Sequence, residues 1–182
     1  MIEQPLPAPH LLFSKENYSE LMQRLRYNFR SSENPNNKIT VTKSQHKSYF
    51  KFTFVRNPWA RAFSLYKNIM RDEIHKRKHR LNANCSLNEF LRLHVGKGML
   101  RPQTYWIKDF KGAIPLDYIG RFENLREDFK TALKMMGAPE IILPHRGKGS
   151  GADYREHYDK ESIDIVAKSY QSEIELFGYS FF

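Results

Sequence analysis

The residues best placed for chemistry in this sequence surround Arg56, where a short apolar run ends and a helix is expected to begin. Asn57 is a favoured N-cap residue, and Pro58 suits the first helical position because its missing N–H would be unpaired there. Free backbone N–H groups and the positive end of the helix dipole would then face an anion. The Arg56 guanidinium is able to hold two phosphate oxygens, and the Ser64 hydroxyl, two turns along the helix, could reach the same anion. The alternative is structural: Arg56 caps a sheet edge, and Ser64 is a small residue on a packed helix.

Strands and helices alternate along the predicted chain, which indicates an α/β domain with a mostly parallel sheet flanked by helices. The run from Lys51 to Val55 is short, aromatic and β-branched, and predicts a buried strand before Arg56. The helix after Arg56 is expected to run to about Asp72. Ser86 and Glu89 have the spacing of a capping box, for a helix through about residue 94. The other expected elements are strands at 10–13, 38–42 and 117–122 and helices at 18–29, 123–136 and 160–177.

Three ordered stretches carry a longer pattern: Phe54-Val-Arg56-Asn-Pro-Trp-x-Arg61-x-x-Ser64-x-Tyr66, then residues 117–129, then residues 154–159 with 174–179. Together they resemble the sulfotransferases that use 3′-phosphoadenosine 5′-phosphosulfate (PAPS), particularly the carbohydrate-type branch. The resemblance implies a P-loop NTPase-like sulfotransferase fold, with PAPS as the sulfuryl donor and a carbohydrate-like hydroxyl as the acceptor. It also implies that Arg56 and Ser64 bind the 3′-phosphate of this anionic nucleotide.

The loop that would hold the 5′-phosphosulfate departs from the family pattern. At the equivalent place, residues 14–21 contain Lys15 and Ser19 where the family has a lysine and a hydroxyl residue, but they contain no glycine. Glycine lets backbone N–H groups close around phosphate oxygens, and Glu16 adds a negative charge beside the expected anion. Lys15 would stabilise the leaving phosphate as a catalytic residue, or it is an exposed lysine in a helix-capping turn. The alternative function is therefore a catalytically impaired sulfotransferase-like protein that binds a nucleotide or a glycan.

A glycine-rich basic loop at residues 144–151 resembles the family's late loop, which closes over the adenosine and its 3′-phosphate. Arg146 and Lys148 would supply charge, and Gly149 permits close backbone approach. Tyr154 follows in the next block and is assigned to the same nucleotide site. The structural alternative is an ordinary surface linker.

Sulfuryl transfer to an alcohol also needs a base for the acceptor proton. The family uses a glutamate or a histidine, and the candidates here are His46, Glu16 and Glu20, with His46 the choice for a catalytic residue. Each of the three could instead be a solvated side chain. Glu123 matches a family block, or it caps the following helix through the dipole.

Residues 75–80 form a dense basic patch in which His75 and His79 are four residues apart. Four neighbouring cations and no clear third ligand argue against a metal site, and no metal is expected. The patch suits an anionic acceptor groove, or it is a solvated helix end. Gln103, Tyr105 and Trp106 could stack on or hydrogen-bond a sugar, although aromatic residues in such a segment more often belong to the core.

Composition sets the outer limits. The 182 residues predict one domain over 1–182, and a single cysteine, Cys85, allows no intrachain disulfide. The formal net charge of +10 favours polyanionic partners, but no motif for specific nucleic-acid recognition is present. No apolar run is long enough to span a bilayer, and the first residues do not resemble a signal peptide, so a cytoplasmic protein is expected.

Overall fold

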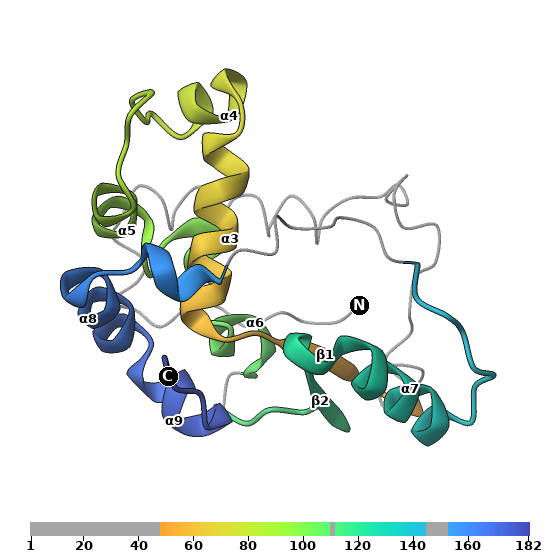
Figure 1. Cartoon of the computed structure of the whole chain (residues 1–182). Helices are drawn as coiled ribbons and strands as arrows, with labels where there is room; N and C mark the ends of the chain where they lie inside the picture. Colours follow the sequence, from red (N-terminus) through yellow and green to blue (C-terminus); the bar gives the residue numbers. More distant parts are fainter. Residues whose placement is uncertain (1–47, 110–111, 145–152) are drawn as a thin grey trace, which may run out of the picture. The chain divides into compact units, whose positions relative to one another are not determined.

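The structure, a computed structural model, describes residues 48–109, 112–144 and 153–182 (Figure 1). The described parts of 51–108 and 114–182 belong to one compact unit, which carries every feature discussed below. Of a second unit the structure describes only residues 48–50, 109, 112 and 113, where the Ala113 N–H donates to an Asp109 carboxylate oxygen at 2.9 Å. The strands expected at 10–13 and 38–42 and the helix expected at 18–29 lie outside the described residues. The single-domain organisation stays a prediction.

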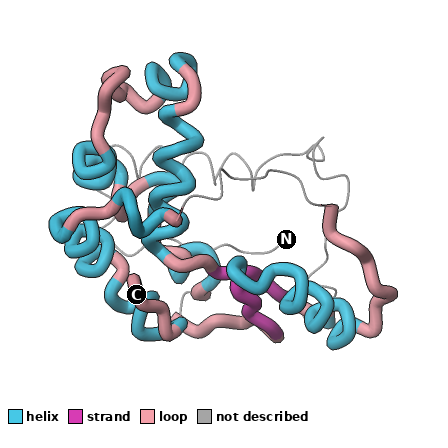
Figure 2. The backbone as a smooth tube through the Cα atoms, in the orientation of Figure 1, coloured by secondary structure: helices cyan, strands magenta, loops and turns pink. Residues whose placement is uncertain are grey.

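Two parallel strands form the sheet of the described residues (Figure 2). β1 (Phe52–Val55) pairs with β2 (Tyr118–Arg121), with Phe52 opposite Tyr118 and Val55 opposite Arg121. Both strands lie where the sequence predicts them, and the α/β class with a parallel sheet and flanking helices is confirmed. The strand before Arg56 is less buried than predicted: Val55 is buried, and the other three residues of β1 are half-buried.

The helix that follows β1 begins as its sequence predicts. α3 (Pro58–Met70) has Pro58 at its first position, and the Asn57 side chain accepts hydrogen bonds from two backbone N–H groups of the first turn. Its buried face joins α5 (Leu87–His94) and α8 (Lys160–Ser169) in the core. The members of this core include Trp59, Phe63, Ile69, Phe90, Leu91, Leu100, Val166, Tyr170 and Phe181.

Short elements connect α3 to the second strand. Asp72 caps α4 (Glu73–Lys78), and the predicted capping box of Ser86 and Glu89 starts α5. The chain then forms a 3₁₀ turn, η2 (Gly98–Leu100), and the single-turn helix α6 (Thr104–Ile107). Polar contacts join α5 to the start of α8: Asn88 donates to Asp159 at 2.8 Å and to Glu161 at 3.4 Å, and Arg92 pairs with Glu161.

The helix after β2 starts two residues later than expected. Residues 122–124 form a 3₁₀ turn, η3 (Phe122–Asn124), and α7 (Leu125–Met136) follows and ends at Gly137 with φ 67°. α7 packs on the sheet through Phe129, whose ring centroid lies 6.4 Å from those of Phe52 and Phe54. Gly120 permits this packing, since a Cβ there would lie only 2.5 Å from the Phe54 ring.

The single helix predicted over 160–177 is wrong. After the 3₁₀ turn η4 (Tyr154–His157), the structure has α8 and a separate helix α9 (Gln171–Phe177), with a break at Tyr170 (φ −121°, ψ 21°). The Tyr170 ring is almost completely buried, and its hydroxyl donates to the Leu100 carbonyl and accepts from the Gly96 N–H. These tertiary contacts hold Tyr170 in a non-helical conformation, which local helix propensity does not anticipate.

Candidate functional site

Arg56 lies between the end of β1 and the start of α3, as the sequence predicts. Figure 1 shows these two elements following each other along the chain. Its guanidinium carbon lies 4.5 Å from the centroid of the Phe122 ring, and the side chain is half-buried. Burial lowers the pKa of Arg56, while the nearby Glu123, Tyr154 and Tyr179 act in the opposite direction. Within the described part of the chain, no carboxylate or carbonyl oxygen accepts a hydrogen bond from this guanidinium. A partly desolvated guanidinium with its donors available suits a phosphate.

The backbone N–H groups around Arg56 are already paired, so the expectation of free N–H groups is wrong. The Arg56 N–H donates to Gln103 Oε1 at 2.8 Å, and the Asn57 N–H donates to Glu123 Oε1 at 2.8 Å. The N–H groups of Trp59 and Ala60 donate to Asn57 Oδ1 at 3.1 and 3.3 Å. An anion at this junction would therefore be held by the Arg56 side chain and the helix dipole rather than by a nest of N–H groups.

The buried Glu173 of α9 holds Gln103, whose side chain bonds the backbone of Arg56. Gln103 Nε2 donates to the Arg56 carbonyl at 2.8 Å, so its side-chain amide hydrogen-bonds both backbone groups of Arg56. The Gln103 backbone N–H and Nε2 also donate to Glu173, which is 1% exposed and whose pKa is raised by burial. Gln103 was a candidate sugar contact from sequence, but here its amide is used to position Arg56.

Glu123 also holds the junction between β1 and α3 through hydrogen bonds. Besides the Asn57 N–H, it accepts a hydrogen bond from the Tyr179 hydroxyl at 3.2 Å, and this hydroxyl also lies 3.1 Å from the Val55 carbonyl. Burial is the main cause of the raised pKa of Tyr179. Glu123 therefore ties the start of α3 to the segment after α9 in place of the helix-capping role that its position suggested.

Further hydrogen bonds bring the last part of the chain to the start of α3. Asn57 Nδ2 donates to the Ser180 carbonyl at 2.8 Å, and the Tyr158 hydroxyl donates to the Trp59 carbonyl at 2.9 Å. Trp59 Nε1 in turn donates to the Ile163 carbonyl at 3.1 Å. The three stretches that carry the family pattern, separated by long stretches of sequence, therefore meet around Arg56 and Asn57.

The structure brings together some of the predicted site residues. Tyr154 is half-buried, with its ring centroid 6.2 Å from that of Tyr158, and it interacts electrostatically with Arg56. Burial raises the pKa of Tyr154. Ser64 is exposed on α3, and no described contact links it to Arg56. The remaining predicted residues lie outside the described residues: Lys15, Ser19, His46, Arg146, Lys148 and Gly149.

The two histidines of the basic patch have different neighbours. His75 Nδ1 lies 2.6 Å from an Asp72 oxygen, whereas the His79 ring packs 5.6 Å from that of His94. Across the described ranges, no group of three or more His, Cys, Asp or Glu side chains is arranged to hold a metal ion. In those same ranges, no helix has the length and apolar character needed to cross a membrane. A cytoplasmic location stays a prediction.

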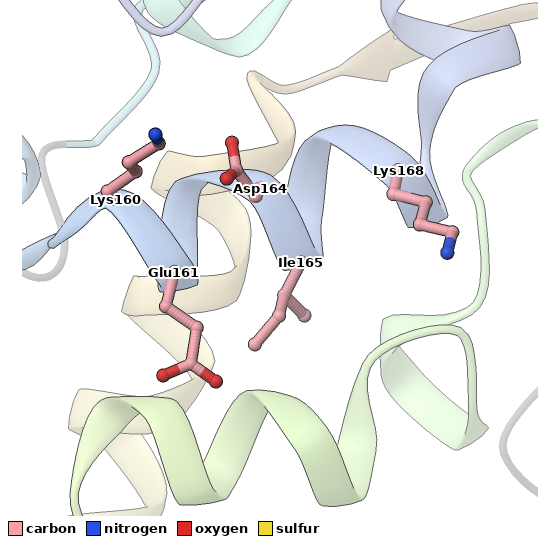
Figure 3. A pocket seen from close by; sticks show the side chains of 5 residues that line it. All are labelled: Lys160, Glu161, Asp164, Ile165 and Lys168. Carbon is pink, nitrogen blue, oxygen red and sulfur yellow. The ribbon is translucent and has the colours of Figure 1, made fainter.

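A surface hollow on α8 does not belong to this site. Lys160, Glu161, Asp164, Ile165 and Lys168 line it (Figure 3). All five come from one helix, none is a predicted site residue, and Glu161 is already paired with Arg92 of α5. The hollow therefore adds nothing to the grouping around Arg56.

Sequence reasoning missed the supporting roles of Gln103, Glu173 and Tyr179. Gln103 contacts Arg56, which is 47 positions away in the sequence, and no local pattern predicts such a contact. Glu173 did leave a signal, because helical spacing places it on one face with Tyr170, Ile174 and Phe177. An acidic residue on an apolar helical face needs a buried polar partner, which here is Gln103.

Comparisons with known proteins show which proteins this chain is similar to. The chain is 30% identical over 117 residues to an uncharacterized protein of Archaeoglobus fulgidus, a match that covers 63% of this chain and 90% of the relative. It is 28% identical over 163 residues to carbohydrate sulfotransferase 14 of Danio rerio and 28% identical over 115 residues to the Homo sapiens protein of that name. These two matches cover 73% and 52% of this chain, but only 44% and 30% of the lengths of those enzymes.

No solved structure matches the chain significantly. The profile described as "Sulfotransferase family" matches residues 10–180, which include every stretch that meets around Arg56. The chain therefore belongs to the sulfotransferase family.

Proposed function

We propose that this protein transfers a sulfuryl group from PAPS to a hydroxyl of a carbohydrate-like acceptor, and that Arg56 binds the 3′-phosphate of the donor. The observation that carries the proposal is the half-buried Arg56 guanidinium, which stacks on Phe122 and whose donors no described oxygen occupies. This group fits a phosphate dianion in charge and geometry. Family membership supports the reaction class, and the names of the two carbohydrate sulfotransferases support the acceptor class.

The residues of this chain would bind and orient the donor. Arg56 and Ser64 would hold the 3′-phosphate, and Tyr154, Arg146, Lys148 and Gly149 would complete the nucleotide site. PAPS supplies the activated sulfuryl group: the acceptor oxygen bonds to sulfur, the bond between sulfur and the 5′-phosphate oxygen breaks, and a base takes the acceptor proton. Lys15 and Ser19 would contact the departing phosphate, and His46 is proposed as the base.

A second candidate function is a sulfotransferase-like protein that binds the nucleotide or a glycan without turnover. The absence of glycine between Lys15 and Ser19 favours it, because a side chain at each position hinders the close approach of N–H groups to phosphate oxygens. Radiolabelled sulfate transfer from PAPS to a panel of glycans separates the two functions. Transfer above the level of a heat-inactivated sample rejects the binding-only hypothesis.

Calorimetry with 3′-phosphoadenosine 5′-phosphate tests the role of Arg56. We expect Arg56→Ala to weaken binding by roughly 10²-fold, since a charge-assisted hydrogen bond is worth about 1.5–3 kcal/mol. Adenosine 5′-phosphate lacks the 3′-phosphate, so the same variant should bind it almost as well as the wild type does. Arg126→Ala, on the exposed face of α7, is the matched control and should bind both nucleotides normally. An equal loss for both nucleotides would contradict the assignment of the 3′-phosphate, and no binding to the wild type would remove the proposed function.

A further inference from the structure

An exposed indole lies close to the Arg56 site. Trp106 of α6 is 58% exposed, whereas the other tryptophan of the chain, Trp59, is 3% exposed in the core. Trp106 meets the Tyr105 ring edge-to-face at a centroid distance of 4.9 Å, and the Arg101 guanidinium carbon lies 4.4 Å from the centroid of Tyr105. The Trp106 ring is thus supported on one side and presents a large apolar surface to solvent. Large aromatic side chains in this setting are typical of binding surfaces.

Two sets of hydrogen bonds attach this segment to the start of α3. The Gln103 side chain holds the Arg56 backbone through two bonds of 2.8 Å. Arg61 Nη2 donates to the carbonyls of Met99 and Arg101 at 2.6 and 2.9 Å. Gln103 is the N-cap of α6, and Trp106 lies three residues later in this single-turn helix. The backbones of Trp106 and Arg56 are therefore separated by on the order of 10 Å. Figure 1 shows α6 beside the start of α3.

The charge of the segment limits which ligand it would attract. Residues 97–108 include Lys97, Arg101 and Lys108 and contain no acidic residue. An indole face carries negative electrostatic potential and attracts the C–H groups of a pyranose ring, whereas cations favour carboxylate or sulfate groups on the same glycan. The combination favours an acidic sugar over a neutral one.

We infer that Trp106, together with Tyr105 and Arg101, forms the acceptor subsite, in which an acidic sugar ring stacks on the exposed indole. This inference rests on the proposed function, because it assumes that Arg56 binds the donor nucleotide. The link through Gln103 fixes the distance between donor and acceptor subsites. A sugar that stacks on Trp106 would then be held at a fixed position beside the nucleotide site.

Fluorescence quenching tests the subsite without any need for turnover. Acrylamide reaches Trp106 but not the buried Trp59, so the quenchable emission of the wild type reports Trp106. We expect a chondroitin hexasaccharide to lower the quenching constant severalfold, and neutral maltohexaose to lower it much less. In calorimetry, Trp106→Ala should lose hexasaccharide binding and Trp106→Phe should retain part of it, because a phenyl ring still offers a stacking face. Met135→Ala, an exposed apolar residue of α7, is the matched control and should bind normally.

Each outcome bears on one proposal at a time. Unchanged quenching with the hexasaccharide, or unchanged binding by Trp106→Ala, overturns the subsite. Equal protection by maltohexaose overturns the assignment of an acidic sugar. Binding of 3′-phosphoadenosine 5′-phosphate by Trp106→Ala should equal that of the wild type, and its loss would show that Trp106 acts on the nucleotide site instead. Failure of the wild type to bind this nucleotide would count against the proposed function, whatever the quenching shows.

Discussion

Removal of the Gln103 side chain should loosen the strand–helix junction and the Arg56 site together. The side chain makes three hydrogen bonds: two with the Arg56 backbone at 2.8 Å and one with Glu173 at 3.1 Å. A net contribution of about 1 kcal/mol for each bond predicts that Gln103→Ala loses about 3 kcal/mol of unfolding free energy. For a chain of this length, that loss corresponds to a decrease in Tm of about 6–12 °C. Urea denaturation followed by circular dichroism measures the unfolding free energy, and thermal unfolding measures the Tm.

A matched substitution separates this effect from the general loss of a glutamine. Gln171 on α9 is exposed and donates to Glu175 at 2.9 Å, so Gln171→Ala should cost less than about 0.5 kcal/mol. A loss below 1 kcal/mol for Gln103→Ala, or a loss equal to that of the Gln171 variant, would refute the claim that Gln103 fixes Arg56.

The variant Gln103→Glu adds a test based on pH. It keeps an acceptor for the Arg56 N–H but places a carboxylate against the Glu173 carboxylate, and burial already raises the pKa of Glu173. The folded state would then bind protons more tightly than the unfolded state. Stability would be greatest below the unfolded pKa of about 4.3 and would fall as pH rises through the higher folded pKa. A flat difference from the wild type between pH 4 and pH 7 would contradict this arrangement of the two side chains.

Two further substitutions test other parts of the fold. Gly120→Ala should cost about 1–3 kcal/mol in urea denaturation, because the new Cβ would lie 2.5 and 2.6 Å from two Phe54 ring atoms. Unchanged stability would show that the Phe54 ring moves aside at little cost. Asp159 accepts hydrogen bonds from the Ser162 N–H and side chain and from Asn88, and these bonds lower its pKa to about 2. The ionised Asp159 therefore stabilises the fold above its unfolded pKa of 3.8, and this stabilisation is lost as pH falls toward 2. The difference in Tm between wild type and Asp159→Asn should therefore shrink from pH 6 to pH 2.5, and a constant difference would show that the charge does not stabilise this helix start.

Local signals in the sequence located the elements of the described fold well. Asn57 and Pro58 predicted the start of α3, and Ser86 with Glu89 predicted the start of α5, because a cap and its helix lie within a few residues of each other. Arg56 was correctly placed at a strand–helix junction for the same reason.

The parts that failed depend on contacts between distant segments. The break at Tyr170 follows from its hydroxyl bonds with residues near 100, and the pairing of the N–H groups around Arg56 follows from Gln103 and Glu123. No cap or periodic pattern encodes such partners, since helix propensity and hydrophobic spacing describe only neighbours along the chain. The predicted catalytic pair Lys15 and His46 lies outside the described residues and stays a prediction.

The long-range bonds at the start of α3 have a consequence for the order of folding. The Asn57 side chain bonds a carbonyl 123 residues later, and the Val55 carbonyl bonds a hydroxyl 124 residues later. Closing loops of this length costs entropy that local helix formation does not recover, so the junction takes its final shape only when both ends of the fold have come together. A peptide of residues 50–70 would contain Arg56 and Ser64, the residues proposed to bind the 3′-phosphate, and would still lack the contacts that position Arg56. The proposed nucleotide affinity should therefore appear in the last kinetic phase of refolding, after helix formation.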